Sequence, residues 1–345
     1  MRALRLPAWK HEPELVEVAE PTAGPGQVVI KIGGAGACHS DLHLMHDFEG
    51  DVLPWGPPFT LGHENAGWVH SLGAGVTSPA VGAPVAVYGP WGCGRCHRCR
   101  EGIENYCERA GEIGAAGGGL GLDGGMAEYM LVPDARLLVP LGDLAPWIAA
   151  PLTDAALTPY HAIKRSLHRL IPGSTAVVIG AGGLGHMGVQ ILKAVSPATV
   201  IVVDKSETAL TLAKQVGADH ALIASDNTAA QIKDLSHGLG ADLVLDLVGA
   251  DATIALGAAA TRSLGDLTLV GIAGGSYLFS FFSSAYEVSF ASTYWGTQTE
   301  LLEVIALARA GHIAPHVERF SLAEAPKVYR RLAVGQIAGR AVIVP

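Results

Sequence analysis

Apolar residues follow two different patterns along the 345-residue chain, and the pattern changes near Pro172. Up to about residue 150, short apolar or β-branched runs such as 28–32 and 84–88 alternate with Gly- and Pro-containing turns. This alternation predicts a β-rich unit. After Pro172, apolar runs recur with helical segments between them, which predicts a doubly wound parallel sheet covered by helices on both faces. Six strands are expected, at residues 176–179, 199–203, 221–223, 243–248, 267–272 and 288–292.

The length predicts two domains, because single hydrophobic cores usually split above about 250–300 residues. We expect a β-rich domain at 1–150, an α/β domain at 151–291 and a C-terminal segment at 292–345. This last segment contains two expected helices, near 301–310 and 323–332, and a final strand at 340–344. It is too short to form a domain, so we expect it to pack on the N-terminal unit.

Composition and charge narrow the function classes. Charged residues make up 16% of the chain against 49% hydrophobic residues, which argues against disorder. The net charge of −9, without a basic run, argues against nucleic-acid binding. No signal peptide and no apolar stretch of bilayer-spanning length are found, so we expect a cytoplasmic protein without a membrane segment.

Four of the five cysteines follow the spacing C-x2-C-x2-C-x7-C. This spacing lets four sulfurs converge on one ion, and structural zinc takes four tetrahedral thiolates. Two disulfides are disfavoured in a reducing compartment. A ferredoxin-type cluster is the closer alternative, but here no proline follows the fourth cysteine and no second cysteine set exists. We therefore predict a structural zinc site at Cys93, Cys96, Cys99 and Cys107.

A glycine-rich turn, G-x-G-x-x-G, follows the expected strand at 176–179 and precedes a helix-like stretch at 186–194. In this setting Gly180 permits the tight turn, Gly182 lets the backbone approach a pyrophosphate, and Gly185 permits close packing of helix on strand. The free N–H groups of the helix N-terminus favour phosphate. The pattern therefore predicts a dinucleotide coenzyme.

Asp204, nineteen positions after the last of these glycines, ends the next expected strand. A carboxylate there can accept hydrogen bonds from the adenosine ribose and would repel a 2′-phosphate, which favours NAD over NADP. Lys205 weakens that preference. The expected coenzyme-binding residues of this region are Gly180, Gly182, Gly183, Leu184, Gly185, Asp204, Lys205 and Ile272.

Cys38, His63 and Asp154 are further candidate metal ligands. Taken singly, each has an ordinary structural explanation: a small buried cysteine, a core histidine, a helix N-cap aspartate. Together they could supply a thiolate, an imidazole and a carboxylate and leave one tetrahedral position open, which is the pattern of catalytic zinc.

These residues give the chain a resemblance to a known family. With the motifs at 38–41, 62–64 and 180–185 and the cysteine quartet in order, the sequence resembles the zinc-dependent medium-chain alcohol dehydrogenases over essentially its whole length. Stretches at 87–94 and 151–154 resemble a bacterial branch that handles secondary alcohols and aryl ketones or aldehydes. The resemblance implies a GroES-like catalytic domain, rejoined by the C-terminal segment, and a Rossmann coenzyme domain.

The resemblance also implies roles for single residues. Cys38, His63 and Asp154 match the catalytic zinc ligands, with Asp154 standing where the family usually has cysteine. Glu64 matches an acid that can approach the metal when substrate leaves, and Asp41 matches the acid that orients the histidine ligand.

A proton relay is implied as well, with Ser40 and His43 as its two protein members. His39 and Arg340 match basic residues that lie against the pyrophosphate. In the implied reaction, zinc lowers the pKa of a bound alcohol, the proton leaves through Ser40, the coenzyme ribose and His43, and the alkoxide passes hydride to the nicotinamide.

Bulky apolar residues fall where the branch lines its substrate pocket, and they suggest a hydrophobic or aryl alcohol, although each could equally be an ordinary core or interface residue. They are Trp55, Leu120, Phe282, Tyr294 and Trp295. A sugar-alcohol or amino-alcohol dehydrogenase and a non-catalytic zinc- and NAD-binding relative are the alternatives. The family leads us to expect two zinc ions per chain and a homodimer or homotetramer acting on a small alcohol, aldehyde or ketone.

Overall fold

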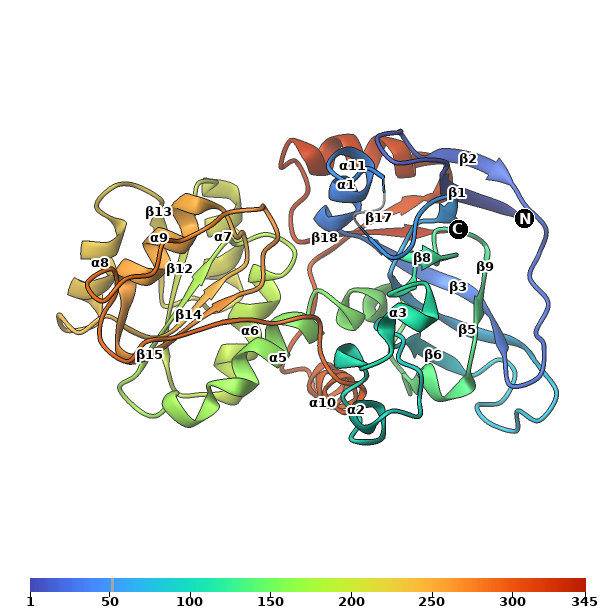
Figure 1. Ribbon diagram of the computed structural model, residues 1–345, viewed down its shortest axis with the longest axis horizontal. Coiled ribbons are helices and arrows are strands. Elements are labelled where there is room, and N and C mark those ends of the chain that lie inside the picture. Colours follow the sequence, from blue (N-terminus) through green and yellow to red (C-terminus); the bar gives the residue numbers. More distant parts are fainter. Residues whose placement is uncertain (51–52) are drawn as a thin grey trace. The chain divides into compact units, whose positions relative to one another are not determined.

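The computed structural model describes residues 1–50 and 53–345, which form two compact units (Figure 1). Unit 1 comprises Met1–Ala155, Gly296–Arg309 and Pro315–Pro345, and unit 2 comprises Ala156–Trp295 and Ala310–Ala314. The sequence-based divisions after residues 150 and 291 lie a few positions before these boundaries. Residues 310–314 join unit 2, where the backbone N–H and C=O of Ala314 both bond to the Gln190 side chain.

Unit 1 is built on a seven-stranded sheet in the order β10-β6-β5-β3-β18-β17, with β9 also paired to β3. A smaller sheet has the order β2-β1-β4, and β7 pairs with β8. The strands are β1 (Arg2–Leu6), β2 (Glu14–Glu17), β3 (Val28–Ala37), β4 (Phe59–Thr60), β5 (Glu64–Leu72), β6 (Pro84–Val87), β7 (Gly117–Gly118), β8 (Gly121–Leu122), β9 (Tyr129–Val132), β10 (Leu138–Pro140), β17 (Val317–Ser321) and β18 (Arg340–Val344).

Strand β18 pairs antiparallel with β3 and parallel with β17, so the C-terminal segment completes the sheet that carries the candidate ligands. The partner of Ala341 across this pairing is Ala37, the residue before Cys38. The α-helices of unit 1 are α1 (His39–His46), α2 (His97–Arg100), α3 (Ala110–Ile113), α4 (Pro146–Ala149), α10 (Gln298–Arg309) and α11 (Ala325–Ala333).

Unit 2 contains a six-stranded, entirely parallel sheet in the order β13-β12-β11-β14-β15-β16. This is the doubly wound order with its switch point between β11 and β14, so the predicted fold class is confirmed. Its strands are β11 (Thr175–Ile179), β12 (Thr199–Asp204), β13 (His220–Ile223), β14 (Ala241–Asp246), β15 (Thr261–Leu269) and β16 (Ser289–Ser292). Its α-helices are α5 (Leu157–Arg165), α6 (Gly185–Val195), α7 (Glu207–Gln215), α8 (Thr228–Leu235) and α9 (Asp251–Ala260).

Several strand ends differ from the sequence-based expectation, most clearly those of β14 and β15. We expected a strand to residue 248, but β14 ends at Asp246, because the carboxylate of that residue accepts the backbone N–H groups of Val248 and Gly249 and turns the chain. Strand β15 begins at Thr261, six positions before the expected start at 267, and its pairing with β14 contains a register shift.

The core of unit 2 consists of buried Val, Ile, Leu and Ala side chains from the sheet and from the helices that cover it. These near-continuous apolar strands are typical of a parallel sheet covered on both faces. Among residues 1–50 and 53–345, no helix combines the length and apolar character that a bilayer crossing requires.

Candidate metal and coenzyme sites

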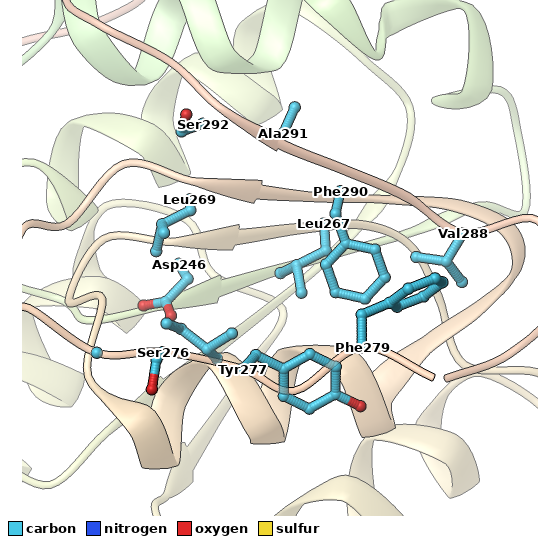
Figure 2. A pocket seen from close by; sticks show the side chains of 12 residues that line it. Asp246, Leu267, Leu269, Ser276, Tyr277, Phe279, Val288, Phe290, Ala291 and Ser292 are labelled. Atoms are coloured by element: carbon cyan, nitrogen blue, oxygen red, sulfur yellow. The ribbon is translucent and has the colours of Figure 1, made fainter. Parts of the chain in front are cut away.

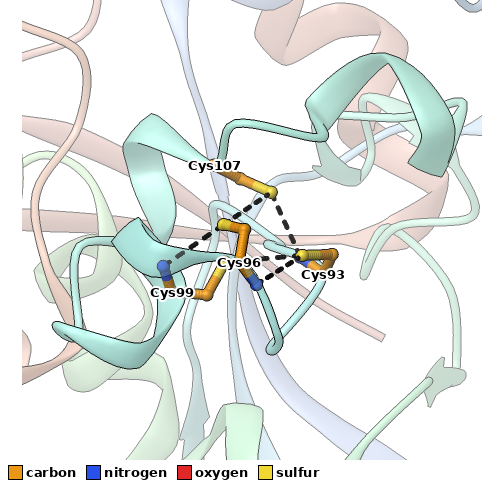
Figure 3. Close-up of side chains that lie close together, drawn as sticks. All are labelled: Cys93, Cys96, Cys99 and Cys107. Atoms are coloured by element: carbon orange, nitrogen blue, oxygen red, sulfur yellow. Dashed lines mark hydrogen bonds between the residues drawn. The ribbon is translucent and has the colours of Figure 1, made fainter.

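The cysteine quartet converges as its spacing predicts (Figure 3). The Sγ atoms of Cys93 and Cys99 lie 3.9 Å apart, as do those of Cys96 and Cys107. These distances exclude disulfide bonds, whereas two thiolates on one zinc ion, each at about 2.3 Å, would lie about 3.8 Å apart. The arrangement therefore fits a tetrahedral zinc ion.

Backbone N–H groups point at the cysteine sulfurs and favour their thiolate forms. Cys96 N–H donates to Cys93 Sγ at 3.3 Å, and Cys99 N–H donates to Cys96 Sγ at 3.4 Å. The backbone N–H of Arg95, helped by that of Cys96, lowers the pKa of Cys93 to about 6. Burial raises the pKa of Cys99, so a cation is needed to hold all four sulfurs as thiolates.

A second ligand cluster, also in unit 1, consists of Cys38, His63, Glu64 and Asp154, with one ligand atom from each within 4.8 Å of the others. Asp154 Oδ2 lies 3.7 Å from Cys38 Sγ and 3.8 Å from His63 Nε2. Tetrahedral zinc ligands of these types lie about 3.4–3.6 Å apart, so a small contraction around an ion would complete the site.

Different elements position these donors. Cys38 is the N-cap of α1, where its backbone N–H is held by the side chain of Asp41 at 3.1 Å. His63 and Glu64 stand at the start of β5, and Asp154 follows a short 3-10 helix at Ala150–Thr153. Residues that are 116 positions apart in the chain therefore meet at one point.

The environment of His63 fixes which ring nitrogen faces the cluster. Nδ1 lies 3.1 Å from Asp41 Oδ1, while Nε2 faces Asp154. Burial opposes the charged imidazole, but Asp41 and Cys38 outweigh it and raise the pKa of His63 well above its usual value. A metal ion would take the place of the Nε2 proton, leaving Nδ1–H to donate to Asp41.

Glu64 forms a buried ion pair that the sequence did not reveal. Arg340 Nε donates to Glu64 Oε2 at 2.9 Å, and Nη2 of Arg340 also contacts Oε1. Arg340 Nη2 also lies 3.5 Å from Asp154 Oδ2. Burial raises the pKa of Glu64 to about 7 against the opposing effect of Arg340. The expected contact of Arg340 with a pyrophosphate stays a prediction.

The residues expected in the proton relay lie on α1. Ser40 Oγ is 3.3 Å from His63 Nε2, at the edge of the ligand cluster. His43, one turn further along, is half-buried and contacts the carboxylate of Asp47, and its ring packs edge-on against that of exposed His39. These residues lead from the cluster toward the surface of unit 1.

The glycine-rich turn lies between β11 and α6 in unit 2. Gly180 has φ +94°, and a Cβ on Gly185 would lie 2.0 Å from the Gly180 carbonyl oxygen, so both positions require glycine. A Cβ on Gly182 would meet nothing within 4 Å. Packing within the protein therefore does not explain glycine at 182, whereas close approach of a pyrophosphate does.

Asp204 ends β12 beside this turn. Its two carboxylate oxygens accept the backbone N–H groups of Ala181, at 2.7 Å, and Ser206, at 2.8 Å. These bonds fix the carboxylate at the carboxyl edge of the sheet, where each oxygen keeps a lone pair for a ribose hydroxyl. Lys205 and Ile272 are both exposed.

The expected substrate-pocket residues divide between the two units. In unit 1, Trp55 packs on Phe59, with ring centroids 5.9 Å apart, and Leu120 precedes Gly121, whose Cβ position would meet the Trp55 ring. In unit 2, the exposed fractions are 86% for Phe282, 43% for Tyr294 and 5% for Trp295.

Unit 2 also contains a cavity of about 560 Å³ at the carboxyl ends of β14, β15 and β16 (Figure 2). Its wall is mostly apolar and includes Leu267 and Leu269 from β15 and the rings of Tyr277, Phe279 and Phe290. This cavity was not predicted, because residues 273–287 contain no helical or strand pattern.

A doubly wound sheet with a glycine-rich turn, together with two metal-type ligand clusters in a β-rich unit, is the arrangement of a two-domain, metal-dependent dehydrogenase. Comparison with known proteins gives the same class. Residues 24–143 match the alcohol dehydrogenase GroES-like domain, and residues 183–310 match the zinc-binding dehydrogenase domain.

Similar proteins match over the full length. The NAD-dependent alcohol dehydrogenase of Sulfurisphaera tokodaii is 38% identical over 100% of both chains. The D-arabinose 1-dehydrogenase (NADP(+)) of Saccharolobus solfataricus is 34% identical over 96% of this chain and 93% of its own. The crystal structure of the alcohol dehydrogenase from Aeropyrum pernix superposes with a TM-score of 0.92, at 36% identity over 100% of both chains.

The chain therefore belongs to the zinc-dependent medium-chain alcohol dehydrogenase family. This confirms the predicted family, the GroES-like and Rossmann fold class, an NAD-linked alcohol-oxidising enzyme as its activity class, and zinc and NAD as its cofactors. Its substrate is a small molecule.

Proposed function

We propose that the protein catalyses the reversible oxidation of hydrophobic primary or secondary alcohols, aryl alcohols among them, to aldehydes or ketones with NAD. The observation that carries the proposal is the convergence of Cys38, His63 and Asp154 in unit 1. Their thiolate, imidazole and carboxylate form a three-ligand set of the kind that leaves one zinc position open to substrate.

A zinc ion held by these residues would supply Lewis-acid polarisation of the substrate hydroxyl, and NAD would supply the hydride acceptor. The protein contributes the orientation of the ligands. Asp41 holds Nδ1 of His63 and the backbone N–H of Cys38, so the imidazole and the thiolate are both fixed before any substrate arrives.

Ser40 and His43 are proposed to move the substrate proton. The Ser40 hydroxyl, 3.3 Å from His63 Nε2, stands where it can accept a proton from a hydroxyl at the cluster. His43 is three residues further along α1 and therefore on the same side of the helix. Its ring, paired with Asp47, is 19% exposed and therefore has access to water.

The coenzyme is proposed to bind unit 2 through the backbone of the glycine-rich turn, with Asp204 on the adenosine ribose. The preorganised carboxylate supports NAD, because a 2′-phosphate would meet its negative charge. The expected contact of His39, an exposed residue of unit 1, with a pyrophosphate stays a prediction.

The preference for apolar substrates rests on Trp55 and Leu120, with Phe282, Tyr294 and Trp295 as further expected pocket residues. Trp55 belongs to a group of aromatic rings with Trp9 and Phe59, so this part of unit 1 is apolar. A sugar dehydrogenase is the second candidate, because one relative is a D-arabinose 1-dehydrogenase.

We further propose a homodimer or homotetramer that works in the cytoplasm. Unit 2 supports assembly, because its edge strand β16 and the preceding segment expose large apolar side chains, including Phe279 and Phe282 at 64% and 86%. Clusters of this kind mark protein interfaces. None of the five cysteines forms a disulfide bond, which suits a reducing compartment.

The proposal is tested with a panel of aryl, aliphatic and polyhydroxy alcohols, each assayed with NAD and with NADP. We expect the highest kcat/KM with an aryl or apolar alcohol and NAD, and a preference for a polyhydroxy substrate would favour the second candidate. Asp154→Ala should lower the zinc content from two ions to one per chain and abolish oxidation. The matched control is Asp143→Ala, at an aspartate whose side chain is 86% exposed.

A further inference from the structure

Tyr329 brings the C-terminal helix α11 into contact with the groups behind the candidate metal ligands. Its side chain is buried, and its phenol hydroxyl donates to Asp41 Oδ2 at 2.7 Å. The same oxygen accepts the backbone N–H of Cys38 at 3.1 Å, and the other carboxylate oxygen lies 3.1 Å from His63 Nδ1. One carboxylate thus connects α11, the N-cap of α1 and the start of β5.

We propose that Tyr329 is a positioning residue for the catalytic metal: by holding Asp41 Oδ2, its hydroxyl sets the orientation in which that carboxylate holds His63 and Cys38. The proposal rests on the proposed metal site and extends it by one residue. It concerns the hydroxyl alone, since a phenylalanine would fill nearly the same volume.

Within residues 1–50 and 53–345, the phenol hydroxyl has one strong acceptor, the Asp41 carboxylate. Besides Asp41, its oxygen lies 3.1 Å from Met126 Sδ, and a thioether is a weak acceptor. Burial, reinforced by the negative charge of Asp41, raises the pKa of Tyr329 well above its usual value, so the hydroxyl keeps its proton and remains a donor. Asp41 itself is fully buried, so solvent does not compete for its oxygens.

Packing alone is the competing explanation, because Ala325, Val328 and Tyr329 form the buried face of α11. A residue that only packs would affect the stability of unit 1 as a whole. A positioning residue would affect the mixed-ligand metal site and leave the cysteine quartet unchanged. The two proposed zinc sites of unit 1 therefore provide an internal comparison.

The experiment measures zinc release from the purified, fully loaded enzyme to an excess of a chromogenic chelator, with residual alcohol oxidation followed in parallel. The release phase that coincides with loss of activity belongs to the Cys38–His63–Asp154 site. Removing a group that supports a ligand typically lowers metal affinity 10–100-fold, so for Tyr329→Phe we expect that phase to be about tenfold faster. The cysteine-quartet phase should not change.

Tyr88→Phe is the matched control, because it also removes a buried phenol hydroxyl, one that donates to the Gly296 carbonyl oxygen at 2.7 Å. It should release both ions at the wild-type rate. Asp41→Asn and the double variant Asp41→Asn with Tyr329→Phe complete a double-mutant cycle. If Tyr329 acts through Asp41, then Tyr329→Phe should not accelerate zinc release further in the Asp41→Asn background.

The outcomes separate the inference from the function it rests on. Three results would overturn the positioning role while leaving the metal site in place. They are an unchanged rate of the activity-linked release phase in Tyr329→Phe, an equal acceleration of both release phases, and additive effects of Tyr329→Phe and Asp41→Asn on the release rate. A wild-type content of one zinc ion per chain would overturn the metal site itself.

Discussion

Replacing Arg340 with methionine tests how far the buried ion pair with Glu64 supports unit 1. The two side chains are 4% and 0% exposed, and two of the guanidinium nitrogens contact the carboxylate. Arg340→Met keeps most of the apolar stem and removes this cation. Loss of one partner of a buried pair costs about 3–5 kcal/mol. At about 2–4 °C per kcal/mol for a unit of this size, we expect Tm to fall by about 6–20 °C.

The loss of stability in Arg340→Met should depend on pH, and the pKa of Glu64 determines the direction. Its pKa is already about 7, because burial outweighs the opposing effect of Arg340, and removing the guanidinium will raise it further. A carboxyl whose folded pKa lies above its unfolded value stabilises the fold below the unfolded pKa and loses that contribution as pH rises through the folded pKa. In the metal-free protein, Arg340→Met should therefore differ from wild type more at about pH 8 than at about pH 5.5.

The assay is thermal unfolding followed by circular dichroism at both pH values. Arg331→Met is the control, because Arg331 pairs with Glu318 at 2.9 Å but the side chains are 30% and 28% exposed. A pair with that much solvent contact is worth about 0–1 kcal/mol. Equal losses in the two variants, or a loss in Arg340→Met that does not change with pH, would refute the reasoning.

Three further predictions concern other parts of the structure. Gly185→Ala should lower Tm, because the added Cβ would lie 2.0 Å from a backbone oxygen. Gly182→Ala should leave Tm unchanged and weaken NAD binding measured by calorimetry. Equal effects of the two variants on Tm would contradict this prediction. In metal-free, folded protein, iodoacetamide at neutral pH should alkylate Cys93, with a pKa of about 6, before Cys99, whose pKa is raised by burial. Mass spectrometry of digests measures the order of alkylation, and the opposite order would contradict this prediction. The pKa of Asp219 is lowered, because the Val200 N–H and a lysine outweigh the effect of burial. Asp219→Asn should therefore unfold at a lower urea concentration than wild type at neutral pH, and this difference in stability should shrink as pH falls below about 4. A difference in stability that stays constant with pH would contradict this prediction.

Sequence reasoning succeeded where the signal is local. The cysteine quartet and the glycine-rich turn lie within a few residues of chain, and their spacing alone restricts the geometry. The same holds for the doubly wound sheet, since its apolar strands recur in order. The set Cys38, His63 and Asp154 is spread over 117 positions, and no local spacing restricts its geometry. Their donor chemistry suggested a shared ion, and the resemblance to a family supported that prediction.

The remaining features depend on contacts that no pattern encodes. Tyr329 lies in a segment whose pattern predicts only a helix. No local feature of the sequence indicates that its hydroxyl donates to Asp41, which is 288 positions away. Arg340 was expected to contact a pyrophosphate, and nothing in the sequence pairs it with Glu64. Its burial against Glu64 follows from the pairing of β18 with β3, a long-range event.

The position of β18 has a consequence for synthesis in the cell. Nearly all of unit 2 is one uninterrupted stretch, so it can fold while the ribosome is still working. Unit 1 cannot complete its fold this early, because its sheet includes β18, which is translated after the whole of unit 2. The sheet that carries Cys38 and His63 is therefore completed only after β18 has been translated.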